Sequence, residues 1–166
     1  MSLRSEWENE TETPNLLELA LIDRFLSAVK LVAEREWDAA IYLFGYVAEM
    51  ALKTAYFRVV GNNAADPVGP MLRPARNAGR LLLPGVSDEN YHGLLFWSEL
   101  LRAKRHEQSR PMGPDMEATL GGYTRVLSLN WMVEMRYHPN RADRADALEV
   151  AEAATWIFNN RVDLGR

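Results

Sequence analysis

Apolar residues recur at the spacing of an α-helix along most of the chain. A first helix of about 20 residues is predicted from Pro14, with Thr13 as its N-cap, because proline suits the first helical position. A second helix is predicted over 37–60, with Gly61 as its stop. Its residues are apolar around most of its circumference, and this favours a place in the middle of a bundle.

The second half of the chain continues the helical pattern after a break. Residues 61–87 are rich in proline and glycine and predict a long connection with a short helical piece around 75–82. Ser87 is expected to cap a third helix, a fourth is predicted over 115–137 before Pro139, and Asp143 is expected to cap a fifth. No run alternates with period two. The predicted fold is all-α, an up-and-down bundle of four to five helices, with one domain at 14–166 after a flexible leader at 1–13.

Three details of packing follow from the pattern. Trp131 and Met135 fall on one helix face and are expected in the core. Gly121 and Gly122, near the middle of the fourth helix, suggest close packing or a bend. The fifth helix is expected to turn six apolar residues inward, namely Ala147, Leu148, Ala151, Ala154, Ile157 and Phe158.

Composition excludes only a few classes of function. Hydrophobic residues make up 48% of the chain and charged residues 25%, as in ordinary globular proteins. The absence of cysteine excludes disulfides, thiolate metal sites and cysteine nucleophiles. No run is long and apolar enough for a membrane span or a signal peptide, so a cytoplasmic protein without membrane contact is expected. The net charge is −4, and only residues 73–144 carry more basic side chains (11) than acidic ones (8), too small an excess for a wide nucleic-acid-binding surface.

Metal and cofactor chemistry finds little support in the motifs. A di-iron bundle needs two Glu-x-x-His motifs, and the chain has only Glu89 to His92, where an acidic residue in a first helical turn complements the helix dipole. Glu134 and His138 are four residues apart, but a third ligand is missing. We therefore predict no metal and no cofactor, and a metal-binding helical-bundle enzyme stays the second alternative.

The most distinctive segment runs from 131 to 140. Arg136, Tyr137 and His138 come where the fourth helix is expected to end, and the polar Asn140 follows. An arginine there can complement the helix dipole, or it can bind a phosphate while Tyr137 or His138 contacts a base or donates a proton. Glu49 lies four residues before Lys53, which indicates either an ion pair on the least buried stripe of the helix or a carboxylate that orients Arg136.

Two stretches, residues 39–53 and 131–162, resemble the HEPN (higher eukaryotes and prokaryotes nucleotide-binding) superfamily. The first is similar to the family's early helix at Ala48, Glu49, Leu52 and Lys53. The second combines a tryptophan, the "E-x-RY-x-P" turn and an alanine-rich last helix. The resemblance implies a helical bundle that commonly forms a homodimer, often with a nucleotidyltransferase partner in a toxin–antitoxin pair. Many members are metal-independent ribonucleases.

The ribonuclease branch of that family is marked by Arg-x4–6-His, and only Arg136 fits this motif. Positions 141–143 hold Arg141, Ala142 and Asp143 where the histidine should lie, and His138 follows Arg136 too closely. We therefore expect a non-catalytic HEPN-like module that binds a nucleotide or RNA phosphate, or a nucleotidyltransferase-type partner. Its site would comprise Arg136, Tyr137, His138 and Asn140, supported by Glu49, with residues 102–110 on the same face. The alternative is a metal-independent endoribonuclease toxin that uses Arg136 and a displaced His138.

Overall fold

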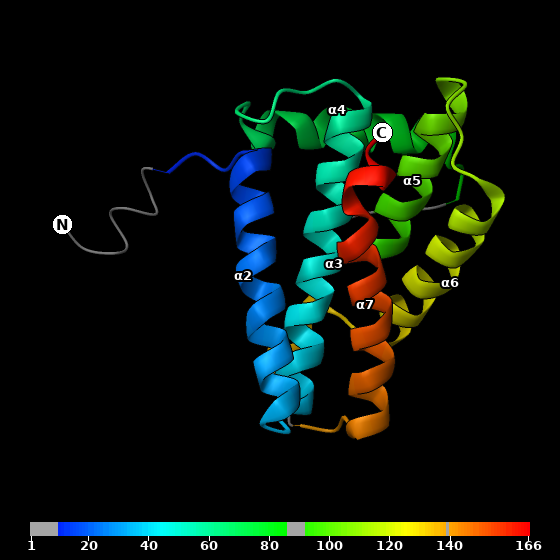
Figure 1. Ribbon diagram of the computed structural model, residues 1–166. Helices are drawn as coiled ribbons and strands as arrows, with labels where there is room; N and C mark the ends of the chain where they lie inside the picture. Colours follow the sequence, from blue (N-terminus) through cyan, green and yellow to red (C-terminus); the bar gives the residue numbers. More distant parts are fainter. Residues whose placement is uncertain (1–9, 86–91, 139) are drawn as a thin grey trace.

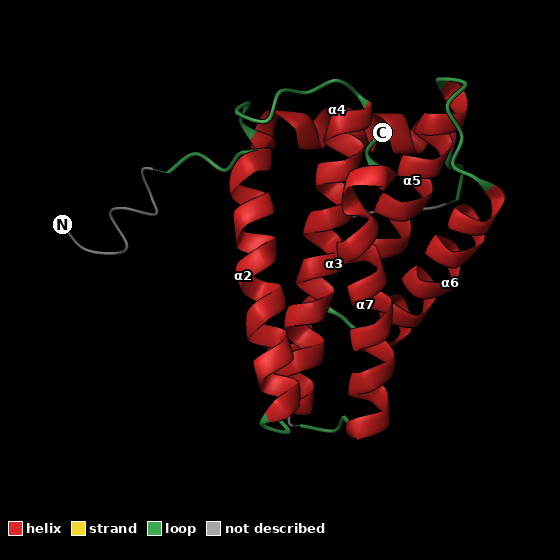
Figure 2. Cartoon of the chain, in the orientation of Figure 1, coloured by secondary structure: helices red, strands yellow, loops and turns green. Residues whose placement is uncertain are grey.

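The computed structural model describes residues 10–85, 92–138 and 140–166. Within these ranges the chain forms six α-helices and one 3-10 helix, and no strand. They are α2 (Pro14–Ala33), α3 (Trp37–Val59), α4 (Val68–Leu82), α5 (Leu94–Glu107), α6 (Pro114–Asn130), η1 (Val133–Tyr137) and α7 (Arg144–Leu164). The prediction of an all-α helical bundle is confirmed (Figure 1, Figure 2). None of the described helices is both long and apolar enough to cross a membrane.

The central helix is α3, as its apolar sequence predicted. Every residue from Val47 to Phe57 is buried, because α2, α5 and α7 all pack against this helix. The helices α2 and α6 form opposite edges of the molecule, and α4 lies across one end of the bundle (Figure 1). The hydrophobic core therefore lies around α3 and is shared by the three surrounding helices.

Two of the predicted helix caps are confirmed. The Thr13 hydroxyl accepts a hydrogen bond from the Leu16 backbone N–H at 3.2 Å, directly before Pro14. The Asp143 carboxylate caps α7 and forms a reciprocal capping box with Asp146. The expected cap Ser87 lies outside the described residues, as do residues 1–9 of the leader, and α5 begins only at Leu94, after Gly93.

The connection predicted for 61–87 contains the 15-residue helix α4. Its buried residues Val68, Met71, Ala75 and Gly79 follow a helical spacing, which proline and glycine obscure in the sequence. Pro74 lies inside the helix, where it removes one backbone donor without ending it. A Cβ on Gly79 would lie 2.3 Å from Phe96 Cε2, so this glycine permits close contact with α5.

The single helix predicted over 115–137 is wrong. The helix α6 ends at Asn130, and both Trp131 and Met132 are extended before η1 begins. The helix ends because Trp131 makes a tertiary contact with α3. The Trp131 indole is 7% exposed, and its Nε1–H donates to the Tyr42 carbonyl at 3.0 Å. A Cβ on Gly45 would lie 2.1 Å from Trp131 Cδ1, so the ring fits only beside a glycine. Pro139, the expected stop, lies outside the described residues.

The packing expectations for the last two helices hold in part. Trp131 is buried and Met135 packs against the core from a half-buried position, although not on one helix face. In α7, Ala147, Ala154 and Ile157 are fully buried and Ala151 and Phe158 half-buried, whereas Leu148 is 44% exposed and was wrongly placed inward. A Cβ on Gly121 or Gly122 would meet no atom within 4 Å, so neither glycine serves close packing.

Three helices end together at the end of the bundle that α4 covers. The buried Arg105 donates from Nη1 to the carbonyls of Asp163 and Leu164 at 3.0 and 2.9 Å, and thereby satisfies the end of α7. The Gln108 amide donates to the Val59 carbonyl at 3.0 Å, at the end of α3. The ends of α3, α5 and α7 are therefore tied to one another by side chains of α5 and the turn after it.

Candidate functional site

The segment that carries Arg136 is fastened to the beginning of α3 at two points. Trp131 provides the first through its hydrogen bond to Tyr42 and its ring contact with Tyr46, at 5.4 Å between centroids. Asp38, in the first turn of α3, provides the second: its carboxylate accepts the backbone N–H groups of Arg141 at 3.0 Å and Ala142 at 3.1 Å. The described residues between these anchors are held against the bundle, although several of their side chains are exposed.

Arg136 and Tyr137 form an exposed pair within this segment. The Arg136 guanidinium carbon lies 4.7 Å from the centroid of the Tyr137 ring, and the Tyr137 side chain is 73% exposed. The pKa of Arg136 is raised, first by Tyr137 and then by the hydroxyl of Tyr42, so the guanidinium stays charged. Arg136 forms no ion pair with another described residue. The predicted site residues His138 and Asn140 are exposed nearby in the chain.

Glu49 is the centre of a separate, buried group. It is 3% exposed, and its Oε1 lies 2.5 Å from Lys53 Nζ. The His92 Nδ1 lies 3.0 Å from each of the two carboxylate oxygens. The predicted pair with Lys53 is present, but it lies in the core rather than on the least buried stripe. The partners that the structure gives Glu49 are Lys53 and His92, whereas the contacts of Arg136 are with the two tyrosines.

Two tyrosines of α3 lie between the Arg136 segment and the Glu49 group. The hydroxyls of Tyr42 and Tyr46 are 3.2 Å apart, and the Tyr46 ring also lies 6.5 Å from the His92 ring. Burial first, and then the hydrogen bond with Tyr42, raises the pKa of Tyr46, while the nearby charge of Arg136 lowers it. Tyr46 thus lies between the Arg136 segment and the Glu49 group, and its hydroxyl stays protonated and uncharged.

A cavity of about 670 Å³ lies beside the same residues. His92, Trp131 and Glu134 line it together with apolar side chains of α5. Sequence reasoning missed the contributions of His92, Tyr42 and Tyr46. The two tyrosines carry a weak signal, because they are four residues apart on the helix of Glu49. His92 carries none, because its carboxylate partner lies 43 residues away in the chain.

The other residues considered from the sequence do not converge here. Glu134 lies in η1 and His138 in extended backbone, so the two do not face one another across a turn of α-helix. Glu89 lies outside the described residues. Where the structure describes the chain, no group of three histidine, aspartate or glutamate side chains could hold a metal ion.

The basic end of α5 does not share the face of Arg136, contrary to expectation. Arg105 and Gln108 contact the ends of α7 and α3, while Trp131 contacts Tyr42 near the start of α3. Tyr42 and Val59 are separated by about 25 Å along the helix. The cations of 102–110 therefore lie at the other end of the bundle.

Comparison of the chain with protein-family models, with characterised proteins and with solved structures finds no match in any of the three.

Proposed function

We propose that this chain is a HEPN-like helical module that binds a nucleotide or an RNA phosphate at the Arg136 segment without cleaving RNA. The observation that carries the proposal is the exposed Arg136 guanidinium stacked on the exposed Tyr137 ring. A guanidinium matches a phosphate with two parallel hydrogen bonds, and an exposed aromatic ring can stack on a base, a contact typically worth about 1–3 kcal/mol. Arg136 and Tyr137 therefore offer a phosphate contact and a base-stacking contact next to each other.

The anchoring of the segment supports binding. Trp131 at one end and Asp38 at the other hold the backbone on either side of Arg136. A ligand then loses less free energy in ordering the site than it would on a free loop. The resemblance to the HEPN superfamily supports the same ligand class, because the arginine of its motif binds phosphate.

The roles of residues 141–143 support the absence of cleavage. The backbone amides of Arg141 and Ala142 bind Asp38, and Asp143 is the N-cap of α7. The positions at which the family's ribonucleases carry their histidine are therefore used here to begin a helix. A general base must reach the proton it removes within about 3 Å, and His138 lies only two residues after Arg136.

Binding can be tested by fluorescence anisotropy with a labelled, short single-stranded RNA. We expect Arg136→Ala to weaken binding at least tenfold, since one bidentate phosphate contact is lost, and to leave the melting temperature nearly unchanged, since the side chain is exposed. Arg125→Ala, which removes an exposed arginine of α6, is the matched control. Equal losses in the two variants, or none in Arg136→Ala, would contradict the proposal.

Cleavage can be tested with labelled total RNA in the presence of EDTA. We expect the RNA to stay intact. Cleavage that disappears in both Arg136→Ala and His138→Ala would replace the proposal by its alternative, a metal-independent endoribonuclease with a displaced histidine.

The proposal includes two protein partners, both of which the resemblance implies. One is a nucleotidyltransferase-type protein in a toxin–antitoxin-like pair. The other is a second copy of the chain, for which the outer face of α2 offers an apolar surface: Leu19 is 60% exposed, Leu26 55% and Val29 48%.

A further inference from the structure

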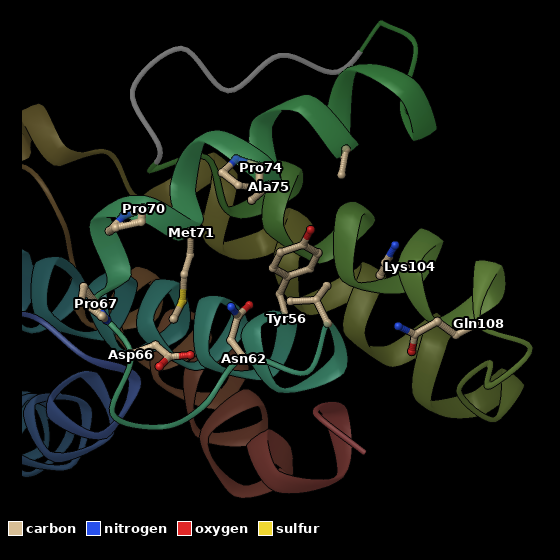
Figure 3. A pocket seen from close by; sticks show the side chains of 12 residues that line it. Tyr56, Asn62, Asp66, Pro67, Pro70, Met71, Pro74, Ala75, Lys104 and Gln108 are labelled. Carbon is tan, nitrogen blue, oxygen red and sulfur yellow. The ribbon is translucent and has the colours of Figure 1, made fainter.

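A second hollow lies at the other end of α3, remote from Arg136. It has a volume of about 650 Å³ and is bounded by α4, the end of α3 and the end of α5 (Figure 3). Its α4 side is apolar and consists mainly of Pro70, Met71, Pro74 and Ala75. The polar groups lie on the side of α3 and α5. The hollow therefore has one apolar wall and one polar wall.

Tyr56 supplies the central polar atom of this hollow. Its side chain is 4% exposed and its hydroxyl points toward α4 (Figure 3). The hydroxyl makes no hydrogen bond to any residue that the structure describes, and it is not among the fully buried unpaired polar atoms, so it is open to the hollow. Burial first, and then the charge of Glu107, raises the pKa of Tyr56 to about 12. The hydroxyl therefore stays protonated at neutral pH and can donate a hydrogen bond to a ligand in the hollow.

Lys104 supplies a cation on the same wall. Its ammonium group is paired with Glu107, and its side chain is 25% exposed. An ammonium group has three donors, so one acceptor leaves capacity for another. The Gln108 amide gives one of its two N–H groups to the Val59 carbonyl, and the Asp66 carboxylate accepts from the Asn63 N–H at 3.0 Å. Tyr56 and Lys104 are thus two donors that a ligand can use, beside the amides of Asn62 and Gln108 that line the same hollow.

We propose that this hollow binds a small amphipathic carboxylate. The ligand's carboxylate would accept from the Tyr56 hydroxyl and the Lys104 ammonium, and a short aliphatic chain would cover Met71, Pro74 and Ala75. A singly charged head group is favoured over a phosphate because Asp66 lines the hollow and Glu107 is paired with Lys104, and both carboxylates repel a more highly charged anion. An alkylammonium head would lie beside the Lys104 ammonium, which repels it.

The test compares hexanoate with 1-hexanol and hexylammonium, which share one chain length and differ in the head group. Binding is followed by titration in two-dimensional NMR spectra of the full chain. We expect hexanoate to shift the resonances of Met71 and Ala75 and to bind at least tenfold more tightly than the other two. Equal affinities of the three compounds would overturn the proposal, because the head group would then not be recognised.

Variants separate recognition from the apolar wall. We expect Lys104→Gln to reduce hexanoate affinity about tenfold and Tyr56→Phe several-fold, with both variants folded because neither removes a packed apolar group. Lys30→Gln, on the exposed part of α2, is the matched control and should bind as the unaltered chain does. Unchanged affinity in both Lys104→Gln and Tyr56→Phe would refute the site. RNA binding by Arg136 is independent of each of these outcomes.

Discussion

The burial of Glu49 shows how a polar side chain can be kept inside an apolar helix. An isolated carboxylate at this depth would be strongly disfavoured, and two cationic or hydrogen-bonding partners, Lys53 and His92, accompany it. A buried cluster of charged side chains need not stabilise the fold more than apolar side chains would. Removing one of its side chains, however, leaves a buried charge without a partner. The spacing of Glu49 and Lys53 predicted their contact. Their burial was not predictable, because it depends on His92 and on Trp97 of α5, which are far away in the chain.

Also at the residue scale, Tyr56 makes the free energy of unfolding decrease at alkaline pH. The folded pKa of about 12 lies above the ordinary value of 10, so the neutral form is favoured in the folded state. This contribution is fully present below pH 10 and is lost as the pH rises from 10 toward 12. We expect Tyr56→Phe to reduce that loss by about 2 kcal/mol.

Urea unfolding of both proteins at a series of pH values measures the effect of Tyr56→Phe. Tyr137→Phe alters an exposed tyrosine and serves as the control, which should follow the unaltered chain. A parallel decline of stability in Tyr56→Phe and the unaltered chain would show that another group titrates.

At the scale of the element, the contact between Gly45 and Trp131 couples α3 to the Arg136 segment. Since a Cβ on Gly45 would lie 2.1 Å from the indole, we expect Gly45→Ala to displace Trp131. The variant should lose about 1–3 kcal/mol of stability through overpacking and should bind RNA more weakly. Thermal unfolding and RNA anisotropy measure the two effects.

Gly122→Ala is the control for this prediction. No atom would lie within 4 Å of its Cβ, and it lies inside a helix, so the variant should be stabilised by up to about 1 kcal/mol. Gly45→Ala with unchanged stability and RNA affinity would show that Trp131 does not anchor the segment.

The sequence predicted elements best where local signals decided them. The starts of α2 and α7 were correct because Thr13 and Asp143 act on their own first turns. The length of α4 was missed because Pro70 and Pro74 mask a helical stripe. The break after Asn130 was missed because it depends on Gly45, a residue of another helix that receives Trp131. Arg136 was singled out from the sequence as a candidate phosphate ligand at the end of a helix, but the ring beside it and the anchors on either side of it required the fold.

At the scale of the whole molecule, the proposed homodimer can be assigned to the outer face of α2. Leu19, Ile22, Leu26 and Val29 follow the alternating spacing of three and four residues that helix pairs use. Two antiparallel copies of α2, related by an axis near Arg24, would pair Leu19 with Val29 and Ile22 with Leu26. One surface is thus complementary to itself, as a two-fold interface requires.

We expect the unaltered chain to be dimeric and Leu26→Glu to be monomeric, because the substitution places two carboxylates near the axis. Light scattering coupled to size-exclusion chromatography gives the mass of each. Leu129→Glu, on an 80% exposed residue of α6, should stay dimeric. If the unaltered chain is monomeric, or if Leu129→Glu dissociates equally, α2 is not the interface.

The two ends of the bundle are fastened by different side chains, and this makes the Arg136 segment independent of the end that α4 covers. At the end covered by α4, Arg105 and Gln108 tie the last turns of α3, α5 and α7 together. At the opposite end, the chain between α6 and α7 is held by one indole and one carboxylate, Trp131 and Asp38. The segment that carries Arg136 therefore keeps its place only while both of these contacts hold, and the loss of either one frees it without disturbing the contacts at the other end of the bundle.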